Sequence, residues 1–190
     1  MQGILAEKEQ IKYEKIWTFP AYRRLAVGDS FIGHINKLLG LEAGKTLIDF
    51  GCGTGRPAQK IKDLGLRVVG IDHAKNCLDA EVDIEFIQSC LWTLPEGLTG
   101  DYGLCTDVLE HIPTEKVDDV LRGIKRCVPV CFISVDDVPD NMGALIGEKL
   151  HMTVRSLTWW ENKLNEHFHY VKAYSQKTFI VNNSHRKAEM

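Results

Sequence analysis

The sequence lacks the long apolar run that a membrane-spanning helix needs. A helix requires about 20 consecutive apolar residues to cross a bilayer, and no stretch of the 190 residues approaches that length. Internal repeats, low-complexity linkers and an N-terminal secretory pattern are lacking too, which disfavours repeat architectures and gives no sign of secretion. We therefore expect a soluble, cytoplasmic protein without a membrane partner.

Closely paired cysteines are lacking as well. The six cysteines are scattered through expected strands and loops without a CxxC spacing; they are Cys52, Cys77, Cys90, Cys105, Cys127 and Cys131. Structural zinc sites need such pairs, and disulfides are rare in the cytosol. We expect reduced thiols and no metal.

The sequence also has little excess charge of either sign. A formal net charge of −3 gives no general attraction to polyanions, so a nucleic-acid partner is left open but would need a local basic patch. With 44% apolar and 26% charged residues the chain can bury a full core, and one domain over residues 1–190 is the expected organisation.

Short apolar runs alternate with helical patterns over residues 46–181. The expected strands are Thr46–Phe50, Arg67–Ile71, Ile84–Gln88, Tyr102–Thr106, Val130–Val135, His169–Tyr174 and Thr178–Val181. The expected helices are Asp29–Gly40, capped by Asp29 or Ser30, Pro57–Leu64, Thr114–Cys127, and Thr158–Phe168, opened by a capping box from Thr158 to Glu161. The alternation predicts an α/β core with a parallel sheet covered on both faces, a terminal hairpin, and a polar tail at residues 182–190 that frays.

Three glycines at every second position follow the first expected strand, in the stretch DFGCGTGRPA from Asp49 to Ala58. Glycine permits sharp bends and close approach to a ligand, and open α/β sheets bind ligands beyond the carboxyl ends of their strands. The carboxylate of Asp49, just before the turn, would repel the pyrophosphate of NAD. The pattern therefore predicts a site for a cationic or neutral ligand.

A second carboxylate ends the next strand. Asp72 closes the stretch VVGID, 17 residues after Gly55. A carboxylate at this spacing from a glycine turn can accept both hydroxyl hydrogens of a ribose. The alternative role of Asp72 is to cap the following helix. We expect ribose recognition, because strand position and spacing agree with the glycine turn.

Three motifs together resemble the class I S-adenosylmethionine-dependent methyltransferases. They are LIDFGCGTG (Leu47–Gly55), VVGID (Val68–Asp72) and CTDVLEHIP (Cys105–Pro113), in the order and spacing of that family. The resemblance implies S-adenosylmethionine as cofactor and S-adenosylhomocysteine as product. It also implies a Rossmann-like, doubly wound sheet of seven strands in the order 3-2-1-4-5-7-6, with the last strand antiparallel.

The resemblance assigns residues to the cofactor. Asp49 would lie near the amino group of the methionine part, and Asp72 would hold the ribose. Where the family often has an acidic residue facing the adenine, this chain has Cys90, and Leu91 and Trp92 would supply an apolar wall, with core packing as the alternative for Trp92. The full expected set is Asp49, Gly51, Cys52, Gly53, Gly55, Asp72, His73, Cys90, Leu91, Trp92, Thr106 and Asp107.

His111 follows the fourth strand, where the resemblance implies that the methyl group emerges. A ring pKa near neutrality suits a general base, so His111 is the candidate catalytic residue. Its alternative role is to shape the cofactor pocket. In-line methyl transfer needs no covalent intermediate.

Two further segments are expected to build the acceptor site. The N-terminal part combines aromatic and basic residues, with Trp17, Tyr22 and Arg23 as candidate acceptor contacts, and residues 1–40 would form a helical lid. The segment after the fifth strand contributes Arg155. Ordinary packing of an N-terminal helix against the sheet is the alternative.

The acceptor is the least specified part of this interpretation. The Asp/Asn-Pro-Pro-Tyr stretch of amino-methylating DNA enzymes and the Pro-Cys pair of cytosine-C5 enzymes are both missing after the fourth strand, which disfavours those two routes. We expect a small-molecule acceptor first and a nucleotide or nucleic acid second. The alternative functions are a non-catalytic S-adenosylmethionine-binding module and an NAD-linked oxidoreductase. Nothing in the sequence indicates an oligomeric state.

Overall fold

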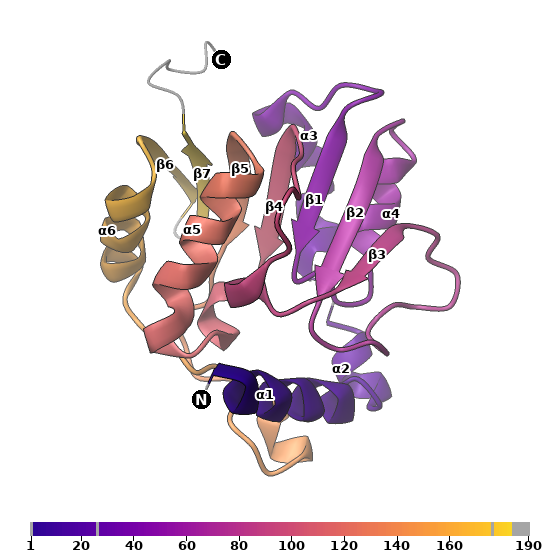
Figure 1. Cartoon of the computed structure of the whole chain (residues 1–190), viewed down its shortest axis with the longest axis vertical. Helices are drawn as coiled ribbons and strands as arrows, with labels where there is room; N and C mark the ends of the chain where they lie inside the picture. Colours follow the sequence, from indigo (N-terminus) through magenta and orange to yellow (C-terminus); the bar gives the residue numbers. More distant parts are fainter. Residues whose placement is uncertain (1, 26, 176, 184–190) are drawn as a thin grey trace.

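The computed structural model describes residues 2–25, 27–175 and 177–183. A seven-stranded sheet forms its centre, with helices on both faces (Figure 1). The strands are β1 (Thr46–Phe50), β2 (Arg67–Asp72), β3 (Glu85–Gln88), β4 (Tyr102–Thr106), β5 (Val130–Ser134), β6 (Tyr170–Ser175) and β7 (Thr178–Asn182). The α-helices are α1 (Gln2–Ile16), α2 (Pro20–Arg23), α3 (Ile32–Leu39), α4 (Arg56–Lys62), α5 (Val117–Cys127) and α6 (Leu157–His167). The short 3₁₀ turns are η1 (Val27–Phe31), η2 (Leu91–Thr93), η3 (Leu109–His111), η4 (Thr114–Lys116) and η5 (Met142–Leu145).

The strand order of the sheet is β3-β2-β1-β4-β5-β7-β6. Strands β1 to β5 pair in parallel, whereas β7 runs antiparallel to both β5 and β6. The predicted order and the antiparallel last strand are therefore confirmed. Each expected strand is present, and no end moves by more than one residue.

Alternation along the strands supplies two apolar layers. In β1, Leu47 belongs to the layer that α3 and α4 cover, and its neighbour Ile48 belongs to the layer that α5 and α6 cover. Successive strand side chains point to opposite faces, so a sheet that is apolar on both faces has to be covered on both. Helix α5 contributes Val120, Leu121 and Ile124, which are fully buried at helical spacing.

The start of the first predicted helix, 29–40, differs from expectation. The segment opens as the 3₁₀ turn η1, and the N-cap position of α3 is Phe31, not Asp29 or Ser30. The Asp29 carboxylate pairs instead with Lys60, at 3.1 Å, which draws it toward α4. The predicted helix end is confirmed, because Gly40 adopts a left-handed φ of 59° there.

The start of the last predicted helix also differs. Helix α6 is capped by Ser156, whose hydroxyl accepts the N–H of Trp159 at 3.2 Å. The helix therefore begins before Thr158, and the capping box expected from Thr158 is wrong. Serine and threonine both cap helices well, so the spacing alone selected the wrong hydroxyl.

Helix α1 lies across the carboxyl ends of the central strands, with the η5 segment on its far side (Figure 1). Ile16 at the end of α1 packs against Ile146 and Leu150 of the segment after β5, and Lys12 Nζ donates to the carbonyl of Lys149 at 3.3 Å. The two segments expected to build an acceptor site are thus packed on each other. A helix is present where a lid was expected, and its movement stays a prediction.

Three further expectations concern the chain as a whole. No helix among the described residues has the length and apolarity needed to cross a membrane. All six cysteines are buried free thiols. Most of the tail predicted to fray, residues 184–190, lies outside the described residues, and the organisation as one domain stays a prediction.

Candidate functional site

The glycine turn after β1 needs glycine for its conformation and its packing. Gly51, Gly53 and Gly55 all have left-handed φ angles, of 79°, 50° and 72°, which other residues adopt only at a cost. A Cβ on Gly51 would lie 2.5 Å from a methyl carbon of Val108. The turn is fixed to β2, because the N–H groups of Gly51 and Cys52 donate to the Ile71 carbonyl at 2.8 and 3.0 Å.

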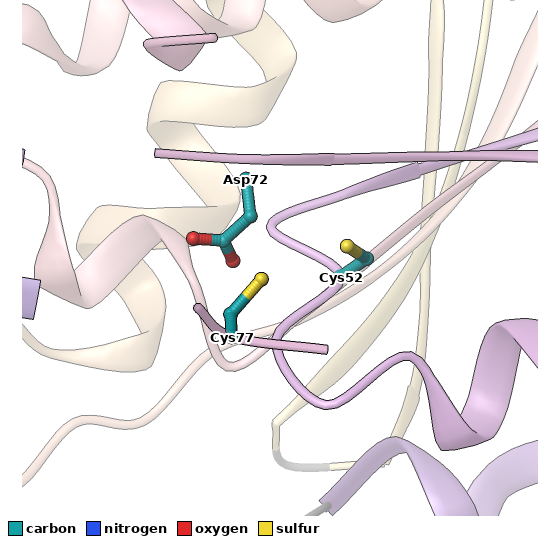
Figure 2. Close-up of side chains that lie close together, drawn as sticks. All are labelled: Cys52, Asp72 and Cys77. Atoms are coloured by element: carbon teal, nitrogen blue, oxygen red, sulfur yellow. The ribbon is translucent and has the colours of Figure 1, made fainter. Parts of the chain in front are cut away.

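Asp72 ties the glycine turn to the loop after β2. Its Oδ2 accepts the N–H of Gly53 at 3.0 Å, and its Oδ1 accepts the N–H of Ala74 at 2.9 Å. Figure 2 shows the Asp72 carboxylate beside the thiols of Cys52 and Cys77. Burial raises the pKa of Asp72, and these backbone N–H groups oppose that shift. Each carboxylate oxygen keeps a second lone pair, so the bonds leave Asp72 able to accept from a ligand.

A small cavity of about 90 Å³ opens beside Asp72. One wall comes from α1 and α2. The opposite wall comes from residues at the carboxyl ends of the strands and from η2. Its lining residues are Glu9, Tyr13, Trp17, Tyr22, Gly51, Asp72, His73, Leu91, Trp92, Asp107, Val108, His111 and Ile112. Trp17 closes the cavity over the turn, since a Cβ on Gly53 would lie 3.1 Å from its indole ring.

A larger cavity of about 370 Å³ adjoins the first and has a more polar lining. The two share Trp17, Tyr22, Gly51, Asp107 and His111. The remaining lining comes from the glycine turn, the end of β4, the η1 region and the segment after β5: Leu25, Gly28, Cys52, Gly53, Thr54, Pro57, Thr106, Asp136, Val138, Pro139, Asp140, Asn141, Met142, Leu150 and His151. Two adjoining hollows thus meet at the carboxyl end of β4.

The family model of a methyltransferase domain matches residues 23–178 of this chain. The chain belongs to the S-adenosylmethionine-dependent methyltransferase family. The match covers β1 to β6 and begins at the end of α2, so α1 lies outside it.

Relatives of this methyltransferase family member are distant. A ubiquinone biosynthesis O-methyltransferase of Nitrosococcus oceani is 32% identical over 37% of this chain and 34% of its own length. The C-methyltransferase NovU of Streptomyces niveus is 28% identical over 67% of this chain and 29% of its length. The magnesium protoporphyrin IX methyltransferase of Synechocystis, solved with bound SAM, has a TM-score of 0.61 and 17% identity over 84% of this chain and 78% of that one. The chain spans less than half the length of the curated relatives that it matches first.

The expected cofactor residues of this methyltransferase separate into two groups. Residues Gly51, Cys52, Gly53, Asp72, His73, Leu91, Trp92, Thr106 and Asp107 line one or both cavities. Asp49, Gly55 and Cys90 line neither. Gly55 is the N-cap residue of α4, and Cys90 is a buried thiol just before η2.

Asp49 is buried beneath the glycine turn. Only 2% of its surface is exposed. Burial, reinforced by the nearby Asp72 carboxylate, raises the pKa of Asp49 to about 7. A positive charge brought to this end of β1 would therefore favour the ionised form of Asp49.

Asp107 is one of the five residues that line both cavities. Among the described residues it is the one non-glycine with a left-handed backbone, at a φ of 53°, a conformation that aspartate tolerates better than most side chains. The Ser134 hydroxyl donates to Asp107 Oδ1 at 3.1 Å, which holds the strained residue at the mouth of β4. Burial raises the pKa of Asp107, and the Ser134 bond opposes that shift.

His111 lines both cavities but is poorly suited to take a proton. Its Nδ1 lies 2.9 Å from the hydroxyl oxygen of Tyr13, and its ring is 4.7 Å from that of His151, centroid to centroid. Burial, with a contribution from His151, lowers the pKa of His111 to about 3. Because a general base works best with a pKa near the operating pH, this environment disfavours the base role expected from the sequence.

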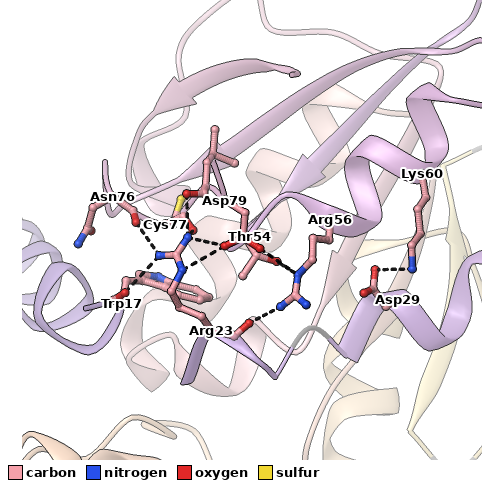
Figure 3. Close-up of polar contacts among 10 residues, drawn as sticks. Trp17, Arg23, Asp29, Thr54, Arg56, Lys60, Asn76, Cys77 and Asp79 are labelled. Atoms are coloured by element: carbon pink, nitrogen blue, oxygen red, sulfur yellow. Dashed lines mark hydrogen bonds and ion pairs between the residues drawn. The ribbon is translucent and has the colours of Figure 1, made fainter. Parts of the chain in front are cut away.

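The two arginines expected at the acceptor lie away from both cavities. Figure 3 shows the Arg23 guanidinium enclosed by acceptors: it donates to Asp79 Oδ1 at 2.6 Å and to the carbonyls of Trp17, Asn76, Cys77 and Leu78. Arg155 is exposed, with its guanidinium carbon 5.8 Å from the Trp159 ring centroid. Arg23 clamps α2 to the loop after β2 and Arg155 faces solvent, so neither lies where the acceptor is expected, and contact of either with the acceptor stays a prediction.

Sequence reasoning missed several cavity residues, of which Tyr13 and His151 contact His111. A signal existed for Tyr13, because it lies four residues before Trp17, and side chains at that spacing share a helix face. No comparable signal existed for His151, which is brought to His111 only by the path of the segment after β5.

Proposed function

We propose that this chain transfers the methyl group of S-adenosylmethionine to a small-molecule acceptor, with the cofactor in the smaller cavity and the acceptor in the larger one. The observation that carries the proposal is the meeting of the two cavities at Asp107 and His111, beside a glycine turn in a methyltransferase fold. Because Trp17, Tyr22, Gly51, Asp107 and His111 line both cavities, ligands bound in the two would lie next to each other there.

The residues of the smaller cavity fit the cofactor chemically. Asp72 has free lone pairs for a ribose, and Leu91 and Trp92 offer an apolar wall for an adenine. Asp107 lines both cavities and Asp49 is buried beneath the turn, so an ammonium or sulfonium group bound here would favour the ionised form of each. Cys90 stands where the family often has an acidic residue facing the adenine. The apolar wall would contact the adenine in place of that acidic residue.

The smaller cavity is tight for a ligand of this size, since ligand pockets commonly measure about 300–1,000 Å³. We infer that α1 shifts outward to admit the cofactor and closes again over it, with Trp17 as the covering side chain. Deletion of residues 1–24 should then leave the sheet folded while abolishing turnover. A fully active truncated protein would contradict this role for α1.

The chain's own contribution to the reaction is alignment and exclusion of water. The bound cofactor supplies an electrophilic methyl group on a sulfonium. Asp107 and its Ser134 bond fix the point where the cavities meet, and Trp17 and Tyr22 cover it. Aligned approach lowers the barrier because translational and rotational entropy is lost on binding rather than in the reaction.

The larger cavity favours a small acceptor. About 370 Å³ holds a compact molecule, and the lining carboxylates Asp136 and Asp140 disfavour a polyanion such as nucleic acid. Named relatives include a ubiquinone biosynthesis O-methyltransferase and a C-methyltransferase, which is consistent with this class of acceptor.

A methyl donor labelled in its methyl group tests the proposal. The protein is incubated with labelled S-adenosylmethionine and, separately, with metabolite extracts, tRNA, DNA and protein fractions, using an Asp72→Asn variant as the control for cofactor-dependent labelling. We expect label in the metabolite fraction. Labelling of nucleic acid alone would overturn the acceptor class, and binding of S-adenosylhomocysteine without transfer to any fraction would favour a non-catalytic module.

A further inference from the structure

Two histidines and a glutamate converge at the wall of the larger cavity. Glu110 and His111 belong to η3, after β4, and His151 belongs to the segment after β5. Each of the three offers one ligand atom, and these atoms all lie within 4.8 Å of one another. Ligand atoms held on one tetrahedral ion by bonds of 2.0–2.2 Å lie about 3.3–3.6 Å apart, so the three would draw closer on binding an ion.

The carboxyl group of Glu110 is incompletely satisfied among the described residues, and burial raises its pKa well above the usual value. Its side chain is fully buried, with 0% exposed. Oε1 accepts the N–H of Asp136 at 2.9 Å, but Oε2 has no hydrogen-bond partner among the described residues, and none of their lysines or arginines forms an ion pair with it. A buried, half-satisfied carboxylate is costly unless a donor or a cation completes it.

The two imidazoles are already oriented by contacts through one ring nitrogen each. His151 Nδ1 lies 2.6 Å from the carbonyl oxygen of Val138; since a carbonyl can only accept, Nδ1 carries a proton, and in the neutral ring Nε2 has the free lone pair. His111 Nδ1 contacts the Tyr13 hydroxyl. Histidines that bind metals characteristically donate their other ring N–H to a carbonyl or similar acceptor, which is the arrangement at His151.

We propose that Glu110, His111 and His151 bind a divalent transition-metal ion, with zinc as the representative. Two imidazoles and one carboxylate suit Zn²⁺ and related ions better than Mg²⁺ or Ca²⁺, which prefer oxygen ligands. The sequence predicted no metal because its cysteines are not closely paired. In the folded chain, the segment after β5 places His151 beside His111, which follows β4.

The ion would have its remaining coordination positions on the cavity side, because His111 and His151 line the larger cavity and Glu110 lies behind them. An acceptor could then be held through an oxygen whose proton the ion makes easier to lose. This consequence rests on the proposed function, whereas ion binding does not. The first experiment therefore measures ion binding alone.

Full-length protein is treated with a chelator, dialysed, and titrated with Zn²⁺ and, as a spectroscopic probe, Co²⁺, without cofactor or acceptor. We expect one bound ion per chain by plasma mass spectrometry, and visible Co²⁺ bands without a thiolate charge-transfer band. His151→Ala and Glu110→Gln should each weaken binding at least about tenfold. His34→Ala, on the exposed face of α3, is the matched histidine control and should bind like the parent.

Three results would overturn the proposal: no stoichiometric ion, unchanged affinity in folded His151→Ala protein, or an intense thiolate-to-cobalt band. The last would place the ion at the other group of candidate ligands in this region, Cys52, Asp72 and Cys77. Circular dichroism checks folding, and His151→Asn serves if the alanine variant is unfolded. Calorimetry with S-adenosylhomocysteine on the same samples separates loss of the ion from failure of the proposed methyl transfer.

Discussion

The two adjoining cavities are built in different ways. The smaller one is lined on one side by Gly51 of the glycine turn, the carboxylate at the end of β2 and the turn η2 after β3, and on the other side by α1 and α2. The larger one depends on the N-terminal segment and the segment after β5, which meet only in the folded chain. On the proposed function, the cofactor half is marked mainly by local sequence features, apart from its wall of α1 and α2, and the acceptor half depends more on long-range packing.

The halves also differ in where their chemistry resides. At the turn, a Cβ on Gly51, Gly53 or Gly55 would lie 2.5–3.1 Å from a neighbouring side chain, so these three positions present only backbone. Around the larger cavity, the functional elements are ionisable side chains, among them Asp136, Asp140 and His151. Substitutions that change backbone conformation should therefore damage the first half, and substitutions that change charge should alter the second.

The largest expected effect is that of Gly51→Ala. The new Cβ would meet Val108 at 2.5 Å while the backbone holds a φ of 79°. We expect the free energy of unfolding to fall by about 2–4 kcal/mol. The affinity for S-adenosylhomocysteine should fall by about 100-fold, which equals about 2.8 kcal/mol. Urea denaturation and isothermal titration calorimetry measure the two quantities.

Gly40→Ala is the matched control for that substitution. Gly40 is also left-handed, at 59°, but a Cβ there meets nothing within 4 Å. It should lose about 1 kcal/mol of stability from backbone strain alone and keep its affinity. If Gly51→Ala bound the ligand as well as Gly40→Ala does, the turn would not be the cofactor contact.

A smaller effect is expected for Asp72→Asn. The amide keeps the shape of the side chain but loses the charge, so the affinity for S-adenosylhomocysteine should drop by about 10–100-fold, or about 1–3 kcal/mol. Asp101→Asn is the control, because Asp101 likewise accepts a backbone N–H, from Thr46 at 2.9 Å, at the opposite end of β1. If both variants lost stability but kept their affinity, Asp72 would have only a structural role, through its hydrogen bonds with Gly53 and Ala74.

Sequence reasoning reached most of the cofactor half because its signals are local. The glycines and Asp72 sit at fixed spacings from strands whose apolar runs are easy to read, and strand ends were correct to within one residue. The exceptions are Asp49, Gly55 and Cys90, which lie in the expected segments but line neither cavity. Spacing predicts where the backbone goes, and burial decides which side chains reach the ligand.

The acceptor half was harder to predict, because the amino-acid composition of a segment does not say which way its side chains point. Arg23 and Arg155 were expected there for their charge, yet one is enclosed by Asp79 and backbone carbonyls and the other is exposed. His151, which does line the cavity, has no local pattern to mark it. Contacts between segments more than a hundred residues apart, such as Lys12 with Lys149, leave no trace in a single sequence.

The pH dependence of S-adenosylhomocysteine binding should reflect the ionisation of Asp49. Its folded pKa of about 7 means that the carboxyl is largely protonated at pH 6 and ionised at pH 8. The ionised form attracts an ammonium group, so the affinity for S-adenosylhomocysteine should rise by at most about tenfold from pH 6 to pH 8. Calorimetry at several pH values should show this rise in the parent and a flatter profile in Asp49→Asn.

The same group has the opposite effect on the stability of the ligand-free protein. Because the folded pKa of Asp49 is raised above the unfolded value, its contribution is full below about pH 4 and is lost as the pH rises to about 7. Asp49→Asn should therefore lose less stability than the parent over that range, as measured by urea denaturation. Identical pH profiles for the two proteins would mean that Asp49 does not titrate there.

The smallest expected effect separates the two arginines once assigned to the acceptor. Arg23→Ala removes a guanidinium that bonds Asp79 and four backbone carbonyls, so it should lower the free energy of unfolding by about 1–3 kcal/mol. Arg155→Ala removes an exposed side chain and should change stability by less than about 0.5 kcal/mol. Once an acceptor has been found, its KM should be unchanged in Arg155→Ala. A clear rise in that KM would extend the acceptor half beyond the larger cavity, to the start of α6, and would restore the role that the sequence suggested for Arg155.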